Sequence, residues 1–463
     1  MYSDIDRAAP HVGAADEAYP IGAAAPRESY LNGDRIIGVA KRSGCDAIHP
    51  GYGFLSENAG FADAVADSGL LFVGPPGRVQ RALGEKTSAR RVAVAAGVPV
   101  AEGTMQPLRD AEEARSIADR IGYPVLLKPA GGGGGKGMRV VRAAADLAAA
   151  WRASTGEATT AFGAPALLLE RLIEHARHIE VQLFADAHGT TVSLGERDCS
   201  VQRRHQKLIE ESPGPHVDPE LRAKLGAAAV KIAAAAGYVN AGTAEFLVAP
   251  DGSFFFLEMN TRLQVEHPVT ELVTGLDLVA LQLRVAAGEK LAIGQDDVRS
   301  RGAAIELRIT AEDPYAGFVP QGGRIDLVRE PSGPGIRMDS GLAAPMTVPT
   351  DYDPLLAKLI AWGPDRPAAL ARARRAVREM IVAGLPTSLP FHSFVLAEAD
   401  FTAGRYDTDY VATHWGAPRP PELSEHAAIA AGLAGLARMR GAARPVVAGA
   451  TPWARAAREE PRR

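Results

Sequence analysis

The residues best suited to chemistry lie between positions 245 and 266. Glu245 falls on one strand of a predicted β-hairpin, because Ala249-Pro-Asp-Gly252 is a strong turn signal. The other strand and its exit carry the segment Glu258-Met-Asn-Thr-Arg-Leu-Gln-Val-Glu266. Alternate residues of an extended chain share a face. If the segment stays extended, two acids, two amides and an arginine are therefore expected on one side: Glu258, Asn260, Arg262, Gln264 and Glu266.

The surroundings of this group indicate burial. The preceding run Phe254-Phe-Phe-Leu257 is apolar on both faces, as in a central strand. Buried carboxylates need a partner or a metal, and the oxygens of Glu245, Glu258 and Asn260 are ligands that Mg²⁺ prefers beside nucleotide phosphates. We therefore expect a metal–phosphate site, with a solvent-exposed polar face as the alternative.

A second feature is the glycine tract Lys128-Pro-Ala-Gly-Gly-Gly-Gly-Gly-Lys-Gly-Met138. Ordering five consecutive glycines costs much entropy, and glycine amides flanked by lysines can bind phosphate oxygens. A Walker loop is excluded, because it would need Gly at Ala130 and Ser or Thr at Gly137. A dinucleotide fingerprint (Gly132, Gly134, Gly137) matches formally, but a strand-like segment follows where a helix is required. The tract predicts a phosphate flap between two strands, with a flexible linker as the alternative.

A third feature is the polar segment Glu196-Arg-Asp-Cys-Ser-Val-Gln-Arg-Arg-His-Gln-Lys207, which lies between two strand-like regions. Taken alone, it is typical of a basic surface turn or of a weak nucleic-acid patch. No aromatic residue alternates with the charges, so base stacking is not supported. Anion binding near a triphosphate fits the segment better.

Composition limits the protein that positions these groups. The 463 residues allow roughly three domains, and 46% hydrophobic with 23% charged residues excludes a mainly disordered, collagenous or coiled-coil chain. A net charge of −4 argues against a protein that coats nucleic acid or acidic membranes. The sequence has two cysteines, Cys45 and Cys199, and it shows neither a signal peptide nor an apolar run long enough to span a membrane. These features predict a cytoplasmic chain with reduced thiols.

The pattern of elements predicts a parallel sheet of βαβ units up to about residue 82, and then a mixed region followed by an α+β unit from 303 to about 412. The expected helices of the mixed region are 86–97, 110–121, 218–236 and 274–287. Its expected strands are 124–128, 167–172, 179–185, 191–196, 241–248 and 253–259, with the three strands from 167 to 196 antiparallel. A further helix, 424–440, is expected in the tail.

Six motifs make the chain resemble biotin carboxylase, the ATP-grasp component of biotin-dependent carboxylases. Beyond the glycine tract, Glu196–Lys207 and Glu258-Met-Asn-Thr-Arg-Leu-Gln-Val-Glu-His-Pro268, they are His49-Pro-Gly-Tyr-Gly-Phe-Leu-Ser-Glu-Asn58, Gly335-Ile-Arg337 and Tyr352-Asp-Pro-Leu-Leu-Ala-Lys358. The resemblance covers residues 2 to about 412. It implies an α/β and α+β chain with an ATP-grasp fold, an N-terminal parallel-sheet domain (1–82), an ATP-grasp domain (83–293, lid about 100–172), a C-terminal α+β domain (294–412) and a tail or linker start (413–463).

The resemblance also implies roles for individual residues. ATP binding is implied for Lys86, Lys128, Gly133, Gly134, Met138, Glu170, Leu172, His178, Gln202, His205 and Leu247. Metal binding is implied for Glu245, Glu258 and Asn260, and bicarbonate binding for Lys207, Arg262, Gln264, Val265 and Glu266. Biotin would lie beside Tyr52, Gly53 and Arg337, and the catalytic residues would be Glu266 (general base), Arg262, Arg337 and Lys207.

The implied reaction is the ATP- and Mg²⁺- (or Mn²⁺-) dependent carboxylation of carrier-bound biotin by bicarbonate through carboxyphosphate, as the first half-reaction of an acetyl- or propionyl-CoA-type acyl-CoA carboxylase. The implied partners are a biotin carboxyl carrier protein or domain, a carboxyltransferase component, and a second copy in a homodimer; nucleic acid and membranes are not expected. The alternatives are another ATP-grasp ligase, joining a carboxylate to an amine, and an inactive nucleotide-binding protein.

Two departures from the family pattern affect these expectations. The strand, Asn-Arg-Gly-Glu turn and helix that open the pattern are absent. We therefore expect an N-terminal sheet short of one strand, which puts dimerisation in doubt, and a start codon missed upstream. The Ala-Met-Lys-Met motif that carries biotin is also absent, so biotin is expected on another chain or on a further C-terminal segment.

Overall fold

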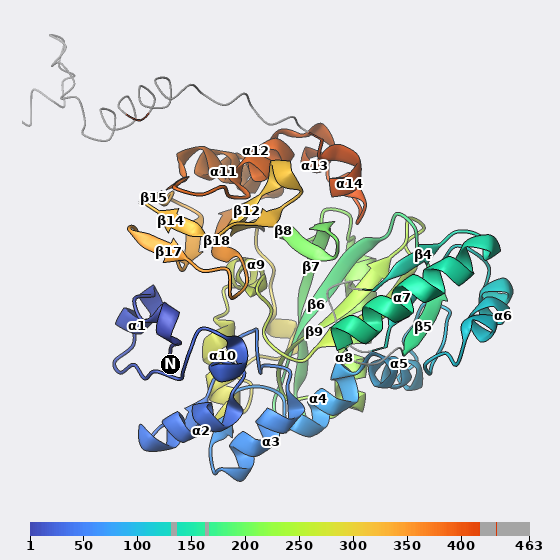
Figure 1. The fold of residues 1–463 in the computed structure, drawn as a ribbon, viewed down its shortest axis with the longest axis horizontal. Coiled ribbons are helices and arrows are strands. Elements are labelled where there is room, and N and C mark those ends of the chain that lie inside the picture. The colour runs from blue at the N-terminus through green and yellow to red at the C-terminus, as the bar shows by residue number, and fades with distance from the viewer. Residues whose placement is uncertain (131–136, 163–165, 417–431, 433–463) are drawn as a thin grey trace, which may run out of the picture. The chain divides into compact units, whose positions relative to one another are not determined.

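A computed structural model describes residues 1–130, 137–162, 166–416 and 432, and its centre is an antiparallel sheet of eight strands (Figure 1). In sheet order the strands are β10 (Phe254–Asn260), β9 (Asn240–Val248), β6 (Arg177–Ala185), β7 (Thr191–Arg203), β8 (Gln206–Ser212), β11 (Ala303–Thr310), β18 (Leu355–Gly363) and β16 (Ile336–Ser340). The pairing of β8 with β11 joins two segments that the sequence assigned to separate domains. One sheet therefore carries residues from 177 to 363.

The two faces of this sheet differ because side chains alternate along each strand. On β6, Ile179, Val181 and Leu183 pack into an apolar core with α8 (Pro219–Ala235). The alternate residues Glu180 and Gln182 point to the other face, which α9 (His267–Thr274) covers at β7, β8, β11 and β18. That second face carries the polar side chains and is buried by α9.

The N-terminal region holds a small parallel sheet, as predicted. Strands β1 (Ala47–Ile48) and β2 (Leu71–Phe72) pair in parallel across α3 (Ala59–Asp67). Its other helices are α1 (Pro10–Ala14), α2 (Gly33–Arg42) and α4 (Gly77–Gly84), and α4 packs on β10 together with α5 (Lys86–Ala95).

A separate three-stranded sheet forms the region that carries the glycine tract. Its strands, in the order β4 (Arg139–Val141), β3 (Val125–Pro129) and β5 (Leu167–Arg171), are antiparallel, and α6 (Ala111–Ile121) and α7 (Leu147–Phe162) pack on them. The tract joins β3 to β4, so the prediction that it connects strand to strand is confirmed. Residues 131–136 themselves, including Gly133 and Gly134, lie outside the described residues.

The C-terminal region completes the fold. Helix α11 (Arg366–Glu379) packs on β18 and β11 around a second apolar core. The remaining elements are α10 (Leu278–Ala286), α12 (Leu389–Ala397), α13 (Ala399–Thr402), α14 (Tyr410–His414) and the strand pairs β12 (Glu312–Asp313) with β13 (Val319–Pro320), β14 (Gly323–Ile325) with β17 (Met346–Val348), and β15 (Leu327–Arg329) with β19 (Ile381–Ala383).

Several predictions of elements need correction. The expected helix 274–287 is found as α10 and begins only at Leu278, and a separate helix that was not predicted, α9, precedes it and ends where Gly275 adopts a left-handed conformation (φ 72°). Strand β7 runs on to Arg203, so the polar segment is not a surface turn but a buried strand. Strand β5 pairs with β3, not with β6. The expected tail helix lies outside the described residues apart from position 432.

Two further expectations concern thiols and membranes. Cys45 is exposed and Cys199 is buried, and both are free thiols. Within the described ranges, none of the helices has the length and apolar character needed to cross a membrane.

Candidate active site

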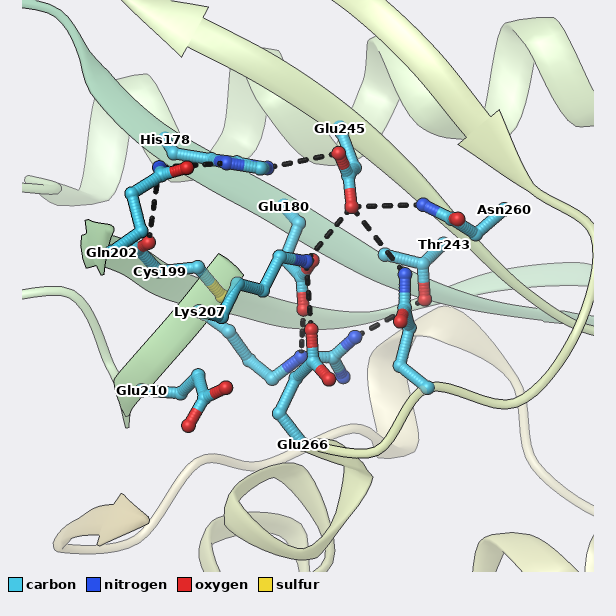
Figure 2. Close-up of polar contacts among 12 residues, drawn as sticks. His178, Glu180, Cys199, Gln202, Lys207, Glu210, Thr243, Glu245, Asn260 and Glu266 are labelled. Atoms are coloured by element: carbon cyan, nitrogen blue, oxygen red, sulfur yellow. Dashed lines mark hydrogen bonds and ion pairs between the residues drawn. The ribbon is translucent and has the colours of Figure 1, made fainter. Parts of the chain in front are cut away.

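Lys207 on β8 is the centre of a buried charge cluster (Figure 2). Its ammonium lies 2.5 Å from Glu180 Oε2, 2.8 Å from Glu245 Oε1 and 2.7 Å from Glu266 Oε1. Burial alone would lower the pKa of Lys207, but the three carboxylates raise it well above its ordinary range. The side chain therefore stays charged, with its three N–H donors all directed at carboxylate oxygens.

Glu266 reaches this cluster from the first turn of α9, where it is the N-cap residue. It is fully buried, and each of its carboxylate oxygens has its own cation: Lys207 on Oε1 and, at 2.9 Å, Arg308 of β11 on Oε2. Burial favours the neutral acid, yet Lys207 and Arg308 together hold the pKa of Glu266 well below its ordinary value. Glu266 is therefore an ionised proton acceptor in a site shielded from water.

Glu245 and Glu258 face each other across the β9–β10 pair, one residue opposite the other. His178 Nε2 lies 3.0 Å from Glu245 Oε2, and Asn260 Nδ2 donates to Glu245 Oε1 at 2.8 Å. Burial would raise the pKa of Glu245, but Lys207 and His178 hold it well below its ordinary value. Burial and then the charge of Glu245 raise the pKa of Glu258.

Two opposed acids and an amide are a donor set that fits a divalent cation. Carboxylate and amide oxygens are hard ligands, and the repulsion that raises the pKa of Glu258 is relieved when a cation lies between it and Glu245. Glu258 is half-buried while Glu245 and Asn260 are buried, so a cation held here also has an open side for a further ligand.

Arg262 and Gln264 lie in the loop that connects β10 to α9. The strand ends at Asn260, so the prediction of one extended face up to Glu266 is wrong. The side chains still converge, because Arg262 Nη1 donates to Gln264 Oε1 at 3.1 Å and Gln264 Nε2 to Glu245 Oε1 at 3.4 Å. Glu57, in the sequence motif 49–58, fixes Arg262 from the other side at 2.9 Å.

A second group of expected site residues lies toward the three-stranded sheet. Lys128 Nζ is 2.5 Å from Glu170 Oε2, which Arg90 also approaches at 3.3 Å. Burial lowers the pKa of Lys86. Partial burial of the ring, and then the charges of His178 and Lys86, lower the pKa of His205.

His205 stands at the tip of the β7–β8 hairpin. Arg204 and His205 both have positive φ (48° and 66°) and connect the paired residues Arg203 and Gln206. Two successive residues with φ > 0 are the mark of a type I′ turn, for which Asn-Gly is the usual sequence. The turn is thus built from two basic residues in a conformation that usually calls for Asn or Gly.

The remaining residues predicted to bind ATP are one polar residue, Gln202, and three apolar residues, Leu247, Met138 and Leu172. Gln202 Nε2 lies 3.3 Å from His178 Nδ1, on the side of the ring opposite the 3.0 Å contact between His178 Nε2 and Glu245 Oε2. Leu247 pairs with His178 across β9 and β6, and it is half-buried like Met138 and Leu172.

The residues expected at biotin lie on the other side of Glu266. Arg337 of β16 contacts Asp339 with two nitrogens, at 2.7 and 2.9 Å, and Glu271 of α9 at 2.6 Å. Tyr52 and Gly53 are exposed, and the ring of Tyr52 lies 5.7 Å from Lys358 Nζ. The structure does not bring Arg337 into direct contact with Lys207 or Glu266, so these residues form a second compartment.

The sequence did not single out four charged residues in or next to the cluster: Glu180, Arg197, Glu210 and Arg308. Arg197 is fully buried and binds Glu180, with Thr243 and Thr270 as further acceptors. Arg308 binds Glu210 Oε1 at 2.6 Å as well as Glu266. The signal for Arg197 was its place inside the polar segment 196–207, whereas Arg308 stands in an alternating strand that is typical of a solvent-facing edge.

Three protein-family models match the chain. They are described as biotin carboxylase N-terminal domain (residues 1–80), carbamoyl-phosphate synthase L chain ATP-binding domain (85–293) and biotin carboxylase C-terminal domain (306–413). Among curated proteins, the chain is 48% identical over 411 residues to the biotin carboxylase of Nostoc sp., covering 89% of this chain and 92% of that one. It is also 50% identical over 414 residues to biotin carboxylase 2 of Bacillus subtilis, covering 89% and 93%.

Solved structures agree with these matches. The biotin carboxylase domain of Hydrogenobacter thermophilus 2-oxoglutarate carboxylase, in complex with MgADP, ADP and bicarbonate, is 45% identical with a TM-score of 0.87, over 89% of this chain and 91% of that one. A biotin carboxylase–ATP-analogue complex from Campylobacter jejuni is 44% identical with a TM-score of 0.87, over 89% and 92%.

Proposed function

Since this chain belongs to the biotin carboxylase family, whose members are ATP-dependent ligases, we propose that it carboxylates biotin with bicarbonate at the expense of ATP. The finer proposal is the first half-reaction of an acyl-CoA carboxylase of the acetyl- or propionyl-CoA type. The observation that carries the activity is Glu266, an ionised and fully buried carboxylate held between Lys207 and Arg308 beside a polar loop.

The first step needs a bound bicarbonate whose proton can leave. Lys207, Arg262 and Gln264, together with the backbone N–H of Val265, provide the positive and N–H groups that hold its oxygens. Glu266 accepts its proton, a contribution typically worth about 10²–10⁴-fold. The bicarbonate oxygen then attacks the γ-phosphorus of ATP, and ADP leaves as carboxyphosphate forms.

Phosphoryl transfer depends on positioning and on neutralising charge. Lys86, Lys128 and His205 supply cations for the phosphates, while Glu170, Leu172, Met138 and Leu247 form the wall for the nucleotide base. His178, fixed by Gln202, lies between this wall and Glu245. Glu245, Glu258 and Asn260 would hold Mg²⁺ or Mn²⁺, which when bound neutralises the charge of the phosphate oxygens. Gly133 and Gly134 would complete the phosphate flap.

The second step takes place in the compartment of Arg337. Carboxyphosphate breaks down to CO₂ and phosphate, and the phosphate takes the N–H proton of biotin. Arg337 stabilises the negative charge on the ureido oxygen, with Tyr52 and Gly53 beside the ring. The carbon dioxide then forms the new N–C bond, and the phosphate leaves with the biotin proton.

Assembly follows from the same proposal. Biotin would be delivered by a biotin carboxyl carrier protein or domain and passed to a carboxyltransferase component in the cytoplasm, and the catalytic unit would be a homodimer. We assign the domains as 1–82, 83–293 with a lid at about 100–172, and 294–412. The proposed partners are supported by relatives named as subunits of pyruvate and methylcrotonoyl-CoA carboxylases.

Glu266→Gln tests the proposal. We expect the wild-type protein to hydrolyse ATP in a bicarbonate-dependent reaction that free biotin stimulates, and the variant to lose about 10²–10⁴-fold of that rate. Glu196→Gln is the matched control, because Glu196 is an equally buried, ion-paired acid (with Arg222, 2.7 Å) outside the cluster. Unchanged turnover in Glu266→Gln would contradict the assignment of the base. Turnover stimulated by an amino acid and not by biotin would contradict the proposed substrate.

A further inference from the structure

Lys358 of β18 lies at the boundary between the bicarbonate loop and the biotin compartment. It is almost completely buried, with 4% of its surface exposed. A buried ammonium needs hydrogen-bond or ion-pair partners to offset its loss of hydration. The identity of these partners therefore indicates the role of the Lys358 side chain. Lys358 has three. Val265 and Tyr52 belong to two of the sequence motifs, and Asp339 binds Arg337 of a third.

The first partner belongs to the bicarbonate loop. Lys358 Nζ donates to the carbonyl oxygen of Val265 at 2.9 Å. This carbonyl is bonded directly to the nitrogen of Glu266, and the N–H of the same Val265 is proposed to hold bicarbonate. A charged donor on this carbonyl therefore fixes the orientation of the Val265–Glu266 peptide. The N–H of Val265 belongs to the preceding peptide, so it is held only indirectly, through the Cα atom of Val265.

The other two partners belong to the biotin compartment. Lys358 Nζ lies 3.2 Å from Asp339 Oδ2, and Asp339 holds Arg337 through two hydrogen bonds. The same ammonium lies 5.7 Å from the centre of the Tyr52 ring, within the range of a cation–π contact. Asp339 and Lys358 are 19 positions apart in the sequence and meet only through the pairing of β16 with β18, so no local sequence pattern indicates this arrangement.

We propose that Lys358 is a positioning residue that couples the two compartments, so that biotin beside Arg337 strengthens the binding of bicarbonate at the Val265 loop. The proposal rests on the proposed function. When the ureido oxygen of biotin draws the Arg337 guanidinium toward itself, the two hydrogen bonds from Arg337 to Asp339 weaken. Asp339 then shifts toward Lys358. The Lys358–Val265 hydrogen bond transmits that change to the loop. Asp339 is the link, and Lys358 is the only side chain in the described part of the chain that contacts Asp339 and Val265 at once.

The test measures the KM for bicarbonate in ATP hydrolysis, with and without saturating free biotin. In the wild type we expect biotin to lower this KM by a factor of about 5 or more, the lower end of ordinary coupling between sites. In Lys358→Met, which keeps the length of the side chain without its charge, the factor falls to about 1. Lys358→Arg retains part of the factor, because a guanidinium can still donate to both partners. A purely structural role would change protein stability and the KM itself but not the factor.

Two controls separate the outcomes. Asp339→Asn removes the charge of the link and is expected to lower the factor as well, so the proposal remains testable if Lys358→Met does not fold. A factor that stays at its wild-type value in folded Lys358→Met or Asp339→Asn overturns the coupling while leaving the proposed function intact. A wild-type protein without bicarbonate-dependent, biotin-stimulated turnover would instead overturn the proposed function itself.

Discussion

Arg308 provides the sharpest test of how the proposed base is tuned. Substitution by Met removes the guanidinium that lies 2.9 Å from Glu266 Oε2 and 2.6 Å from Glu210 Oε1, and leaves Lys207 on the other oxygen of Glu266. Burial raises the pKa of Glu266 and the neighbouring cations lower it, so the loss of one cation must raise this pKa. The base would be protonated over more of the acidic range.

The size of the rise can be bracketed from the geometry. At 2.9 Å and an effective dielectric constant of about 20, the Coulomb energy is about 6 kcal/mol, or about four pKa units, as an upper bound. Shifts caused by one opposite charge at such distances are about 1–3 units. We therefore expect the acidic limb of the rate profile of Arg308→Met to move upward by about 1–3 pH units, with activity recovering as the pH increases.

The assay is the pH dependence of kcat/KM for bicarbonate in ATP hydrolysis, which reports ionisations of the free enzyme. The bicarbonate concentration is corrected for its own ionisation at each pH. Arg366→Met is the matched control, because Arg366 has a similar exposed fraction (16% against 15% for Arg308) and makes a similar two-point contact, with Glu211 at 2.6 and 3.0 Å, outside the site. Breaking either buried pair is expected to cost about 3–5 kcal/mol of unfolding free energy.

The comparison can refute the reasoning in two ways. A folded Arg308→Met enzyme whose acidic limb stays in place, or moves downward, would show that Arg308 does not set the ionisation of Glu266. An upward shift of equal size in Arg366→Met would show that loss of stability, and not the local charge, moves the limb.

Two further predictions concern stability and the lid. Burial raises the pKa of Asp198 from 3.8 to about 6, which disfavours its ionised form in the folded state. The resulting destabilisation appears as the pH rises through 3.8 and is complete above about 6. In urea unfolding, Asp198→Asn should therefore be more stable than the wild type by up to about 3 kcal/mol at pH 7, and no more stable at pH 3.5. Persistence of the gain at low pH would contradict it. Gly103→Ala would place a Cβ 2.4 Å from the carbonyl oxygen of Leu169. We therefore expect thermal unfolding to show a loss of about 1–3 kcal/mol in unfolding free energy, together with a higher KM for ATP. The control is Gly156→Ala inside α7, where the added Cβ would meet no atom within 4 Å and the unfolding free energy should increase by up to about 1 kcal/mol. Equal effects of the two glycine substitutions would contradict the assigned clash.

The proximity of Glu245, Glu258 and Asn260 could be predicted from the sequence because it depends on a local element. Glu245, Glu258 and Asn260 lie on the two strands of one hairpin, so the turn alone brings them near each other, whereas the direct pairing of Glu258 with Glu245 depends on a bulge between Phe256 and Glu258 that no sequence pattern indicated. The same holds for the flap, whose flanking strands β3 and β4 are close in sequence. Where a single turn joins two strands, residue type and spacing are sufficient to predict which side chains lie near each other, but not their exact pairing.

The base's environment could not be predicted because it depends on a distant strand pairing. Arg308 and Glu210 meet through the pairing of β11 with β8, in which residues almost a hundred positions apart lie opposite each other. The sequence Ala-Ala-Ile-Glu-Leu-Arg-Ile-Thr310 alternates as though one face met water. That face is instead covered by α9, a helix that the sequence pattern did not predict. No local pattern records which helix will cover a strand.

The ion pairs of the cluster also bear on the order in which substrates would bind. Lys207 is fully engaged by Glu180, Glu245 and Glu266, so an anion gains little by approaching it while those contacts last. A cation bound by Glu245 and Glu258 would compete for the oxygen that Glu245 offers to Lys207, and would free one of its N–H donors. Bicarbonate could then take that donor beside Glu266. Under the proposed function, metal-nucleotide binding therefore prepares the bicarbonate site, and the buried acids that surround Lys207 keep it closed to other anions until then.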